Sequence, residues 1–325
     1  MQDTNTAKNL HDLLSDEAVE ERRFVLPITQ EPERLDKTLA LLLPEHSRSR
    51  LQSWIEDGHV QVNQQVVRTR HILYPGDVIT VQEQAAPEST AFTAEPVDFP
   101  VVEESPHWIV VNKPAGLVTH PGAGNWTGTL LNGLLYRYPE LASVARAGIV
   151  HRLDKMTSGL MVVARTETAQ THLVRQLQSR SVKREYRALV HGFVAAEGTI
   201  NAPIGRDPHV PVRMAVNGSA PREAITHFHC LRHGLAERGI AFSEVVCKLE
   251  TGRTHQIRVH MANQKHPLLG DDLYGGKHML GAERQMLHAK ALGFEDPATG
   301  QLVKFESAIP DDMNAVRECI EWKDN

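Results

Sequence analysis

One acidic residue lies among basic side chains just before a strongly apolar run. Asp154 belongs to the stretch His-Arg-Leu-Asp-Lys-Met-Thr-Ser-Gly at residues 151–159, and residues 160–164 are all apolar. A polar turn that ends in glycine before such a run predicts a loop leading into a strand buried on both faces. A carboxylate against apolar walls costs free energy unless it is paired or takes part in chemistry. Asp154 is therefore a candidate catalytic carboxylate; the alternative is that its side chain caps the turn.

Two further side chains could take part in that chemistry, a phenol and a guanidinium. Tyr186 lies in residues 185–190, whose composition predicts a strand. Arg258 ends the stretch Thr-Gly-Arg-Thr-His-Gln-Ile-Arg at residues 251–258, where Thr254 can cap a short helix. The chain holds no nucleophilic cysteine motif. The candidate chemistry is therefore that of a single carboxylate.

The spacing of the other polar residues indicates neither a metal nor a nucleotide site. His255 and His260 are five residues apart and cannot share one helix face as metal ligands do, and the three cysteines form no Cys-x-x-Cys motif. The glycine-rich loop at residues 116–128 matches neither the Walker phosphate loop nor the dinucleotide fingerprint. We therefore expect no cofactor and no metal.

The residues after 105 contain the elements that must position these groups. A buried strand is predicted at 108–111, and Pro114, which follows Lys113, cannot continue a central sheet ladder. Leucine spacing predicts a helix at 130–135, and Thr166 is a candidate N-cap of a second helix. Further strands are predicted at 225–228 and 245–249.

A separate small module precedes these elements. Residues 24–82 predict two helices and several short strands, with Ser47 as N-cap of a second helix that carries Arg48 and Arg50. The element order and residues 34–36, 47–50, 58–63 and 75–77 resemble the S4 RNA-binding domain, although Gln64-Gln65 replaces the usual glycine in one turn. The resemblance implies that Arg48 and Arg50 contact RNA phosphates. The alternative is that both arginines merely solubilise an exposed helix face.

Length and composition set the domain plan and the compartment. The 325 residues suffice for two domains, and we expect a flexible acidic tail at 1–22, the S4-like domain at 23–85, a linker at 86–105 and a catalytic domain at 106–325. A net charge of −5 means that any polyanion must be bound by local basic patches. Scattered cysteines and the absence of an apolar run of membrane-spanning length predict a cytoplasmic protein.

Four motifs, in this order, resemble the pseudouridine synthases of the RluA family. They are Asn-Lys-Pro-x-Gly at 112–116, the stretch at 151–159, Lys-x-Glu-Tyr at 183–186 and the stretch at 251–258. One departure is Met156, where the family commonly has an acidic residue; it should change the charge of the loop without removing a catalytic group. The resemblance implies an α+β fold in which an S4 domain precedes a catalytic domain built on a mixed, largely antiparallel sheet.

The resemblance also implies a reaction and its residues. The family breaks the N1–C1′ bond of a flipped-out uridine in RNA and forms a C5–C1′ bond, which gives pseudouridine without cofactor or metal. Asp154 would be the catalytic carboxylate, and attack on C1′, attack on C6 and removal of a sugar proton all remain open for it. Arg258 would pair with it and Tyr186 would stack on the base. Arg152 would fill the space that the base leaves, and we expect further RNA contacts from Lys113, Arg253 and His255.

The resemblance finally implies a substrate. We expect a monomer that acts on 23S ribosomal RNA or on the assembling large ribosomal subunit, without a membrane or a nucleotide cofactor. The competing hypothesis is a non-catalytic RNA-binding or ribosome-assembly factor. An altered residue at 154, 186 or 258 would favour that hypothesis, and none is altered.

Overall fold

The chain folds into two compact units, Met1–Ser89 and Thr90–Asn325. The structure, a computed structural model, describes residues 21–84, 91–122 and 124–324. The tail predicted at 1–22 lies outside the described residues, except for Glu21 and Arg22, which belong to the first strand. No helix within these ranges is long and apolar enough to cross a bilayer.

The first unit places two helices beside a four-stranded sheet of order β1-β6-β3-β4, with β2 and β5 as a separate pair. Leu39 and Trp54 from the two helices pack with Val60 and Ile79 of the sheet. The elements are β1 (Glu21–Val25), β2 (Glu33–Arg34), α1 (Leu35–Leu42), α2 (Arg48–Glu56), β3 (Val60–Val62), β4 (Gln65–Val66), β5 (Ile72–Leu73) and β6 (Val78–Gln82). The predicted order of helices and strands is confirmed.

The helix cap and the tight turn of this unit can be compared with the sequence. The hydroxyl of Ser47 accepts a hydrogen bond from the backbone N–H of Arg50, so it is the N-cap of α2. The turn between β3 and β4 closes without glycine, with Asn63 and Gln64 both at positive φ, 49° and 66°. A side chain in this left-handed region costs free energy, so the departure at Gln64 strains the turn but does not prevent it.

The second unit is built on a ten-stranded sheet of order β11-β15-β16-β10-β17-β9-β8-β7, with β18 added to β17 and β19 to β15. Its pairings are antiparallel except for β9 with β17, which confirms the mixed, largely antiparallel sheet. Its strands are β7 (Val101–Glu104), β8 (Trp108–Lys113), β9 (Ser158–Ala164), β10 (Lys183–His191), β11 (Glu197–Asn201), β15 (Ile225–Ala236), β16 (Ile240–Leu249), β17 (Leu287–Glu295), β18 (Leu302–Glu306) and β19 (Glu321–Asp324). A small separate sheet contains β12 (Ile204–Arg206), β13 (Met214–Val216) and β14 (Ser219–Arg222).

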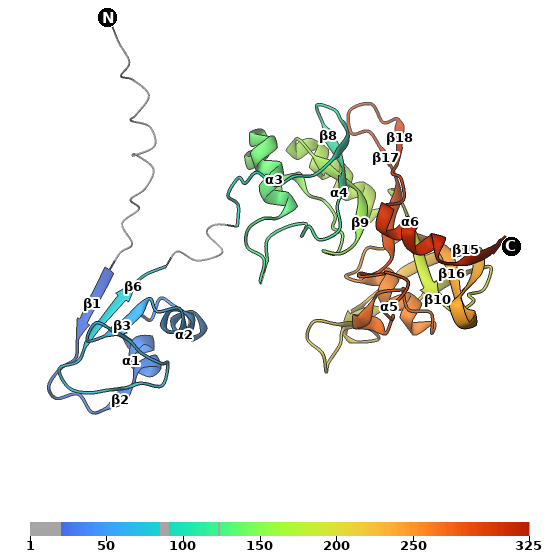
Figure 1. Cartoon of the computed structure of the whole chain (residues 1–325). Coiled ribbons are helices and arrows are strands. Elements are labelled where there is room, and N and C mark those ends of the chain that lie inside the picture. The colour runs from blue at the N-terminus through green and yellow to red at the C-terminus, as the bar shows by residue number, and fades with distance from the viewer. Residues whose placement is uncertain (1–20, 85–90, 123, 325) are drawn as a thin grey trace, which may run out of the picture. The chain divides into compact units, whose positions relative to one another are not determined.

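Helices cover both faces of the large sheet (Figure 1). On one face, Met161 of β9 packs with Leu134 of α3 and Ile257 of α5. On the other face, Val162 packs with Leu173 of α4. All seven residues of β9 are buried, so the strand is covered on both faces as predicted. The helices are α3 (Leu130–Arg137), α4 (Glu167–Gln178), α5 (Gln256–Asn263) and α6 (Asp311–Glu318), with short 3-10 turns at η2 (Pro139–Ser143), η3 (Ala145–Gly148), η4 (Glu237–Gly239) and η5 (Asp272–Tyr274).

The segment predicted as a linker differs from that expectation in its described part. Residues 101–104 form β7 on the edge of the sheet. Upstream, the side-chain amide of Asn132 donates to the carbonyls of Ala91 and Thr93, and Phe99 is buried in the core. Residues 91–105 therefore pack on the second unit. Their Ala, Pro and Glu content suggested a linker, because composition does not reveal a helix that supplies partners for an extended backbone.

Candidate active site

The register of the central strands brings the Asp154 loop to Tyr186. Ala289 of β17 pairs with Gly159 on one side and with Tyr186 of β10 on the other. Two neighbouring strand spacings amount to roughly 10 Å, so both motifs meet over one strand. Gly159 permits this approach, because a Cβ at its φ of 119° would lie 2.3 Å from the carbonyl oxygen of Ala289.

The same register places Arg258 at this end of the sheet. β16 pairs with β10, with Cys247 opposite Tyr186, and the chain then leaves β16 at Leu249 and enters α5 at Gln256. His255, and not Thr254 as predicted, occupies the N-cap position of α5, at a φ of 56°. Asp154, Tyr186 and Arg258 line one cleft of about 590 Å³.

The loop that carries Asp154 is held by hydrogen bonds to its successive backbone carbonyls. The carbonyl of residue 153 accepts from the Thr119 hydroxyl, that of 154 from the Thr157 N–H, and that of 156 from Arg284. The carbonyl of residue 155 accepts from both the Lys113 ammonium and the Gly116 N–H. Four successive carbonyls thus have partners, three of them bound from other segments, so the loop is preorganised before any substrate binds.

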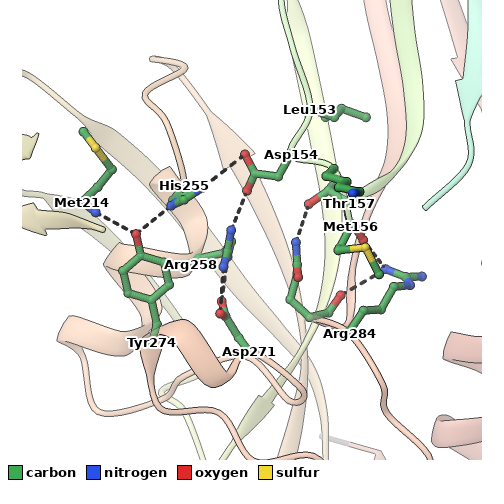
Figure 2. Close-up of polar contacts among 12 residues, drawn as sticks. Leu153, Asp154, Met156, Thr157, Met214, His255, Arg258, Asp271, Tyr274 and Arg284 are labelled. Carbon is green, nitrogen blue, oxygen red and sulfur yellow. Dashed lines mark hydrogen bonds and ion pairs between the residues drawn. The ribbon is translucent and has the colours of Figure 1, made fainter. Parts of the chain in front are cut away.

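The carboxylate of Asp154 points to Arg258 and not to its own turn (Figure 2). Arg258 Nη1 lies 3.1 Å from Asp154 Oδ2, and Arg258 donates from Nε and Nη2 to the two oxygens of Asp271, at 2.7 and 2.9 Å. Asp271 is 1% exposed and Arg258 7%. A bidentate pair of this kind fixes the plane of a guanidinium. The predicted pairing of Arg258 with Asp154 is present, with a second carboxylate behind it.

Burial and charge act in opposite directions on Arg258. Burial lowers the pKa of its guanidinium, but the hydrogen bonds and charges of Asp271 and Asp154 outweigh burial and raise that pKa above its ordinary value. The cation beside Asp154 is therefore permanent.

Tyr186 and Arg184 occupy the cleft side of β10. They are two residues apart, so they point to the same face of the strand, and both side chains are buried. Burial raises the pKa of Tyr186, which keeps the phenol neutral. Arg184 Nη2 donates to the carbonyl of Glu250, whereas its Nε has no hydrogen-bond partner in the described part of the chain. The cleft therefore holds a phenol beside a partly satisfied guanidinium.

The rest of the cleft is basic although the chain is acidic overall. The predicted Arg152 is exposed on its lip, and Arg253 lines it while its Nε donates to the Glu223 carbonyl. Further arginines that line the cleft are Arg146, Arg180 and Arg184. This is the local basic patch that a polyanion would require in a protein of net charge −5.

Lys113 corrects one expectation. It was predicted to contact RNA, but its side chain is 0% exposed and its ammonium donates to the carbonyls of Pro114, Leu117 and Lys155 at 2.8–3.1 Å. Burial lowers its pKa to about 7, while three carbonyl acceptors match the three protons of an ammonium. Lys113 therefore braces the Asp154 loop from inside and is not accessible to phosphate.

The two S4-like arginines differ in environment. Arg48 is exposed at the start of α2, as a phosphate contact requires. Arg50 is half-buried, with its guanidinium 5.6 Å from the centre of the Trp54 ring. Cation–π packing accounts for part of its position, so Arg48 is the better placed of the two for RNA.

One group of side chains in the described residues has the spacing of a metal site. Glu45, His46 and Glu83 lie within reach of one ion in the first unit. The guanidinium of Arg22 already donates to both carboxylates, so the protein itself compensates part of their charge. No described cleft residue joins that group.

Sequence reasoning did not identify Asp271 and Tyr274 as part of the site. Asp271 follows Leu268-Leu269-Gly270, so a carboxylate directly after a buried apolar pair was a usable signal, as it was for Asp154 after Leu153. Arg146 gave no such signal, because a single exposed arginine within a short 3-10 turn has no recognisable pattern.

Comparison with known proteins agrees with this geometry. The family model described as RNA pseudouridylate synthase matches residues 107–263, and the S4 domain model matches residues 33–79. A protein of Neisseria meningitidis serogroup A named ribosomal large subunit pseudouridine synthase D is 50% identical over 301 residues, 89% of this chain and 79% of its own length. The protein of the same name from Xanthomonas campestris is 47% identical over 316 residues, 91% of this chain and 93% of its own.

A solved structure supports the same assignment. Human RNA pseudouridylate synthase domain containing 1 superposes with a TM-score of 0.55 at 29% identity, over 74% of this chain and 92% of its own. The region matched by the synthase family model, residues 107–263, contains β8 to β16, α5 and the cleft residues Asp154, Tyr186 and Arg258. With both domains matched in order and relatives of this identity over most of their length, the chain belongs to the RNA pseudouridylate synthase family.

Proposed function

We propose that this protein converts uridines of large-subunit (23S) ribosomal RNA into pseudouridine, with Asp154 as the catalytic carboxylate. The observation that carries the proposal is the Asp154 carboxylate, held by Arg258 inside a basic cleft and on a fully anchored loop. The cleft volume of about 590 Å³ lies in the range of small-molecule sites, which is sufficient for one flipped nucleotide.

Each cleft residue then has a task. The N1–C1′ bond breaks, the uracil turns, and C5 bonds to C1′; C5 then loses its proton to solvent and N1 takes up a proton, so the step is a net isomerisation. Arg258 pairs with the Asp154 carboxylate and holds it in place, and Tyr186 offers its ring to the base. Arg152, exposed at the lip, fills the gap that the flipped base leaves in the RNA. Arg253 and Arg146 contact phosphates on the rim.

The choice of RNA rests on the relatives and on the first unit. The two relatives described above carry ribosomal large subunit in their names, and the S4 domain adds Arg48 on an exposed helix face. The proposal needs no cleft residue from a second chain, and it includes a monomer as the acting form. An isomerisation without redox change or hydrolysis needs no nucleotide cofactor, and this substrate places the enzyme in the cytoplasm.

Tritium release tests the proposal. The protein is incubated with unmodified large-subunit RNA that carries tritium at C5 of uridine, and release is followed under single-turnover conditions. Asp154→Asn should reduce release on the order of 10³-fold or more while RNA binding persists, and Asp311→Asn, at an exposed carboxylate on α6, should behave as wild type. Undiminished release by Asp154→Asn would refute the catalytic assignment. RNA binding without release by the wild-type protein would favour the assembly-factor hypothesis.

A further inference from the structure

A second chain of polar contacts, beside Arg258, leads to the other carboxylate oxygen of Asp154 (Figure 2). The backbone N–H of Met214 in β13 donates to the Tyr274 hydroxyl oxygen at 2.9 Å. That oxygen lies 2.7 Å from His255 Nδ1. The other ring nitrogen, His255 Nε2, lies 4.0 Å from Asp154 Oδ1. The carboxylate therefore has a partner for each oxygen, Arg258 at Oδ2 and His255 at Oδ1.

The positions of the protons on Tyr274 and His255 can be assigned by counting the hydrogen-bond donors in this series of contacts. A backbone N–H can only donate, so Met214 occupies a lone pair of the Tyr274 oxygen. If His255 Nδ1 also carried a proton, the phenol would receive two donors and its own proton would lack its nearest acceptor. The arrangement that satisfies every group has the Tyr274 O–H donating to His255 Nδ1. The neutral ring must then carry its proton on Nε2, the nitrogen that faces Asp154.

The surroundings hold this pair in place. Tyr274 is 8% exposed, and the guanidinium carbons of Arg213 and Arg258 lie 5.5 and 5.0 Å from its ring centre. His255 has a φ of 56°, which for a residue with a side chain is a strained conformation of the kind found at functional sites. The strained backbone at His255 thus costs free energy locally and directs the imidazole toward the Asp154 carboxylate.

We propose that Tyr274 and His255 form a positioning pair, in which the phenol fixes the imidazole as its Nε2–H tautomer so that a neutral donor holds the free oxygen of Asp154. This inference rests on the proposed function of Asp154. His255 was predicted to contact RNA; here it acts on the carboxylate. The 4.0 Å separation exceeds a hydrogen bond, and contacts of this kind in ligand-free enzymes commonly shorten when the substrate binds.

A neutral donor suits the task better than a cation. A second cation would stabilise the carboxylate further and make it less reactive, whereas a neutral N–H orients it. Burial lowers the pKa of His255, the first of the causes that act on it. The charged and titratable groups that face the ring are Asp154 and Arg152 from the motif loop, Arg258 from α5, Asp271 from the following turn and Tyr274 from η5.

The tautomer can be measured without any assay of activity. Two-bond ¹H–¹⁵N spectra of the full chain with labelled histidine distinguish a protonated Nδ1 from a protonated Nε2, and the signals missing in His255→Gln identify the residue. We expect the neutral Nε2–H form at pH 7 in the wild type, and a higher imidazole pKa in Tyr274→Phe, because the donor that stabilised the neutral ring is gone. A protonated Nδ1 or a cationic ring at pH 7 would overturn the proposal.

Kinetics separate positioning from a purely structural role. Tyr274→Phe and His255→Leu should each lower kcat about tenfold, roughly one hydrogen bond to a charged group, with KM unchanged. The double variant should lose no more than His255→Leu alone, because the phenol acts only through the imidazole. His255→Gln, which keeps an N–H at the Nε2 position, should recover most of kcat. The acidic limb of the kcat profile should move to higher pH in Tyr274→Phe.

The controls make failure unambiguous. His209→Gln, an exposed histidine between β12 and β13, should match wild type in every measurement. Additive losses in the double variant, or no rescue by His255→Gln, would overturn the pair even if release by the wild type is normal. Absence of release by the wild type would instead refute the proposed function, and the spectra would still report the tautomer.

Discussion

Replacing Asp271 by asparagine tests how far the site depends on a residue that does not line the cleft. Asp271 receives two charge-assisted hydrogen bonds from Arg258, at 2.7 and 2.9 Å, and both residues are buried. Asp271→Asn keeps the shape but offers one acceptor oxygen, and it turns an amide N–H₂ toward a guanidinium N–H. One strong hydrogen bond is lost, and a donor–donor contact replaces it.

The effects of Asp271→Asn on stability and on kcat can be estimated from these contacts. A hydrogen bond to a charged group contributes about 1.5–3 kcal/mol, and breaking a buried ion pair by removing one charge costs about 3–5 kcal/mol. We expect the free energy of unfolding to fall by about 3 kcal/mol. Arg258 would then be free to turn toward Asp154, and misplacement of a positioning group by about 1 Å can lower kcat about 10²-fold. KM should stay the same, because RNA does not reach Asp271.

The assay is single-turnover tritium release at saturating RNA, with circular dichroism at the assay temperature to show that the variant is folded. The matched control is Asp272→Asn, the neighbouring carboxylate, whose side chain is 81% exposed; it should keep kcat and stability. If folded Asp271→Asn retained kcat within about threefold of wild type, the buried carboxylate would not position Arg258, and our account of the site would be wrong at that point.

Two further predictions concern stability. Burial lowers the pKa of His151 to about 3, and its Nε2 accepts the Val162 N–H. Between about pH 6.5 and pH 3 the unfolded chain therefore binds a proton at His151 that the folded chain does not bind. The free energy of unfolding decreases as the pH falls through that window, by at most about 1.4 kcal/mol per pH unit. His151→Gln, whose amide oxygen can still accept that N–H, should flatten the dependence of the free energy of unfolding on pH, measured in urea titrations from pH 6.5 to 4. The exposed control His172→Gln should leave this dependence unchanged. The same dependence in His151→Gln and in wild type would contradict the assignment to His151. Gln64→Gly should stabilise the first unit by about 0.5–1 kcal/mol, because exposed Gln64 has a φ of 66°; a thermal unfolding midpoint that is unchanged or lower would show that the turn is not strained.

The sequence by itself was sufficient for features that depend on neighbours along the chain. Ser47 and Thr166 cap helices as their positions predict, because a cap is satisfied within three residues. The apolar run at 160–164 is a strand with every residue buried. The motif around Asp154 indicated the carboxylate, and the family resemblance supplied its partners Arg258 and Tyr186.

The burial of Lys113 depends partly on the local sequence and partly on the tertiary structure. It comes two residues after Val111 in β8, and strand periodicity therefore places it on the same face as core residues. That signal is present in the sequence, but lysine is rarely buried, so residue type argues the other way. The lysine is tolerated inside because two loop segments, residues 114–117 and the Asp154 loop, present three carbonyls to it, and the sequence does not show that these carbonyls converge.

Only the tertiary structure decided which distant groups share the cleft. Ala289 links Gly159 to Tyr186 through strand register, and Asp271 and Tyr274 reach Arg258 and His255 through the turn after α5. Charge pairs and proton positions depend on burial and on separations of a few ångströms, whereas the local sequence sets only the conformation of a few neighbouring residues. The sequence by itself therefore determined the family, most of the helices and strands and the candidate carboxylate, and the packing of loops at one end of the sheet decided what holds that carboxylate in place.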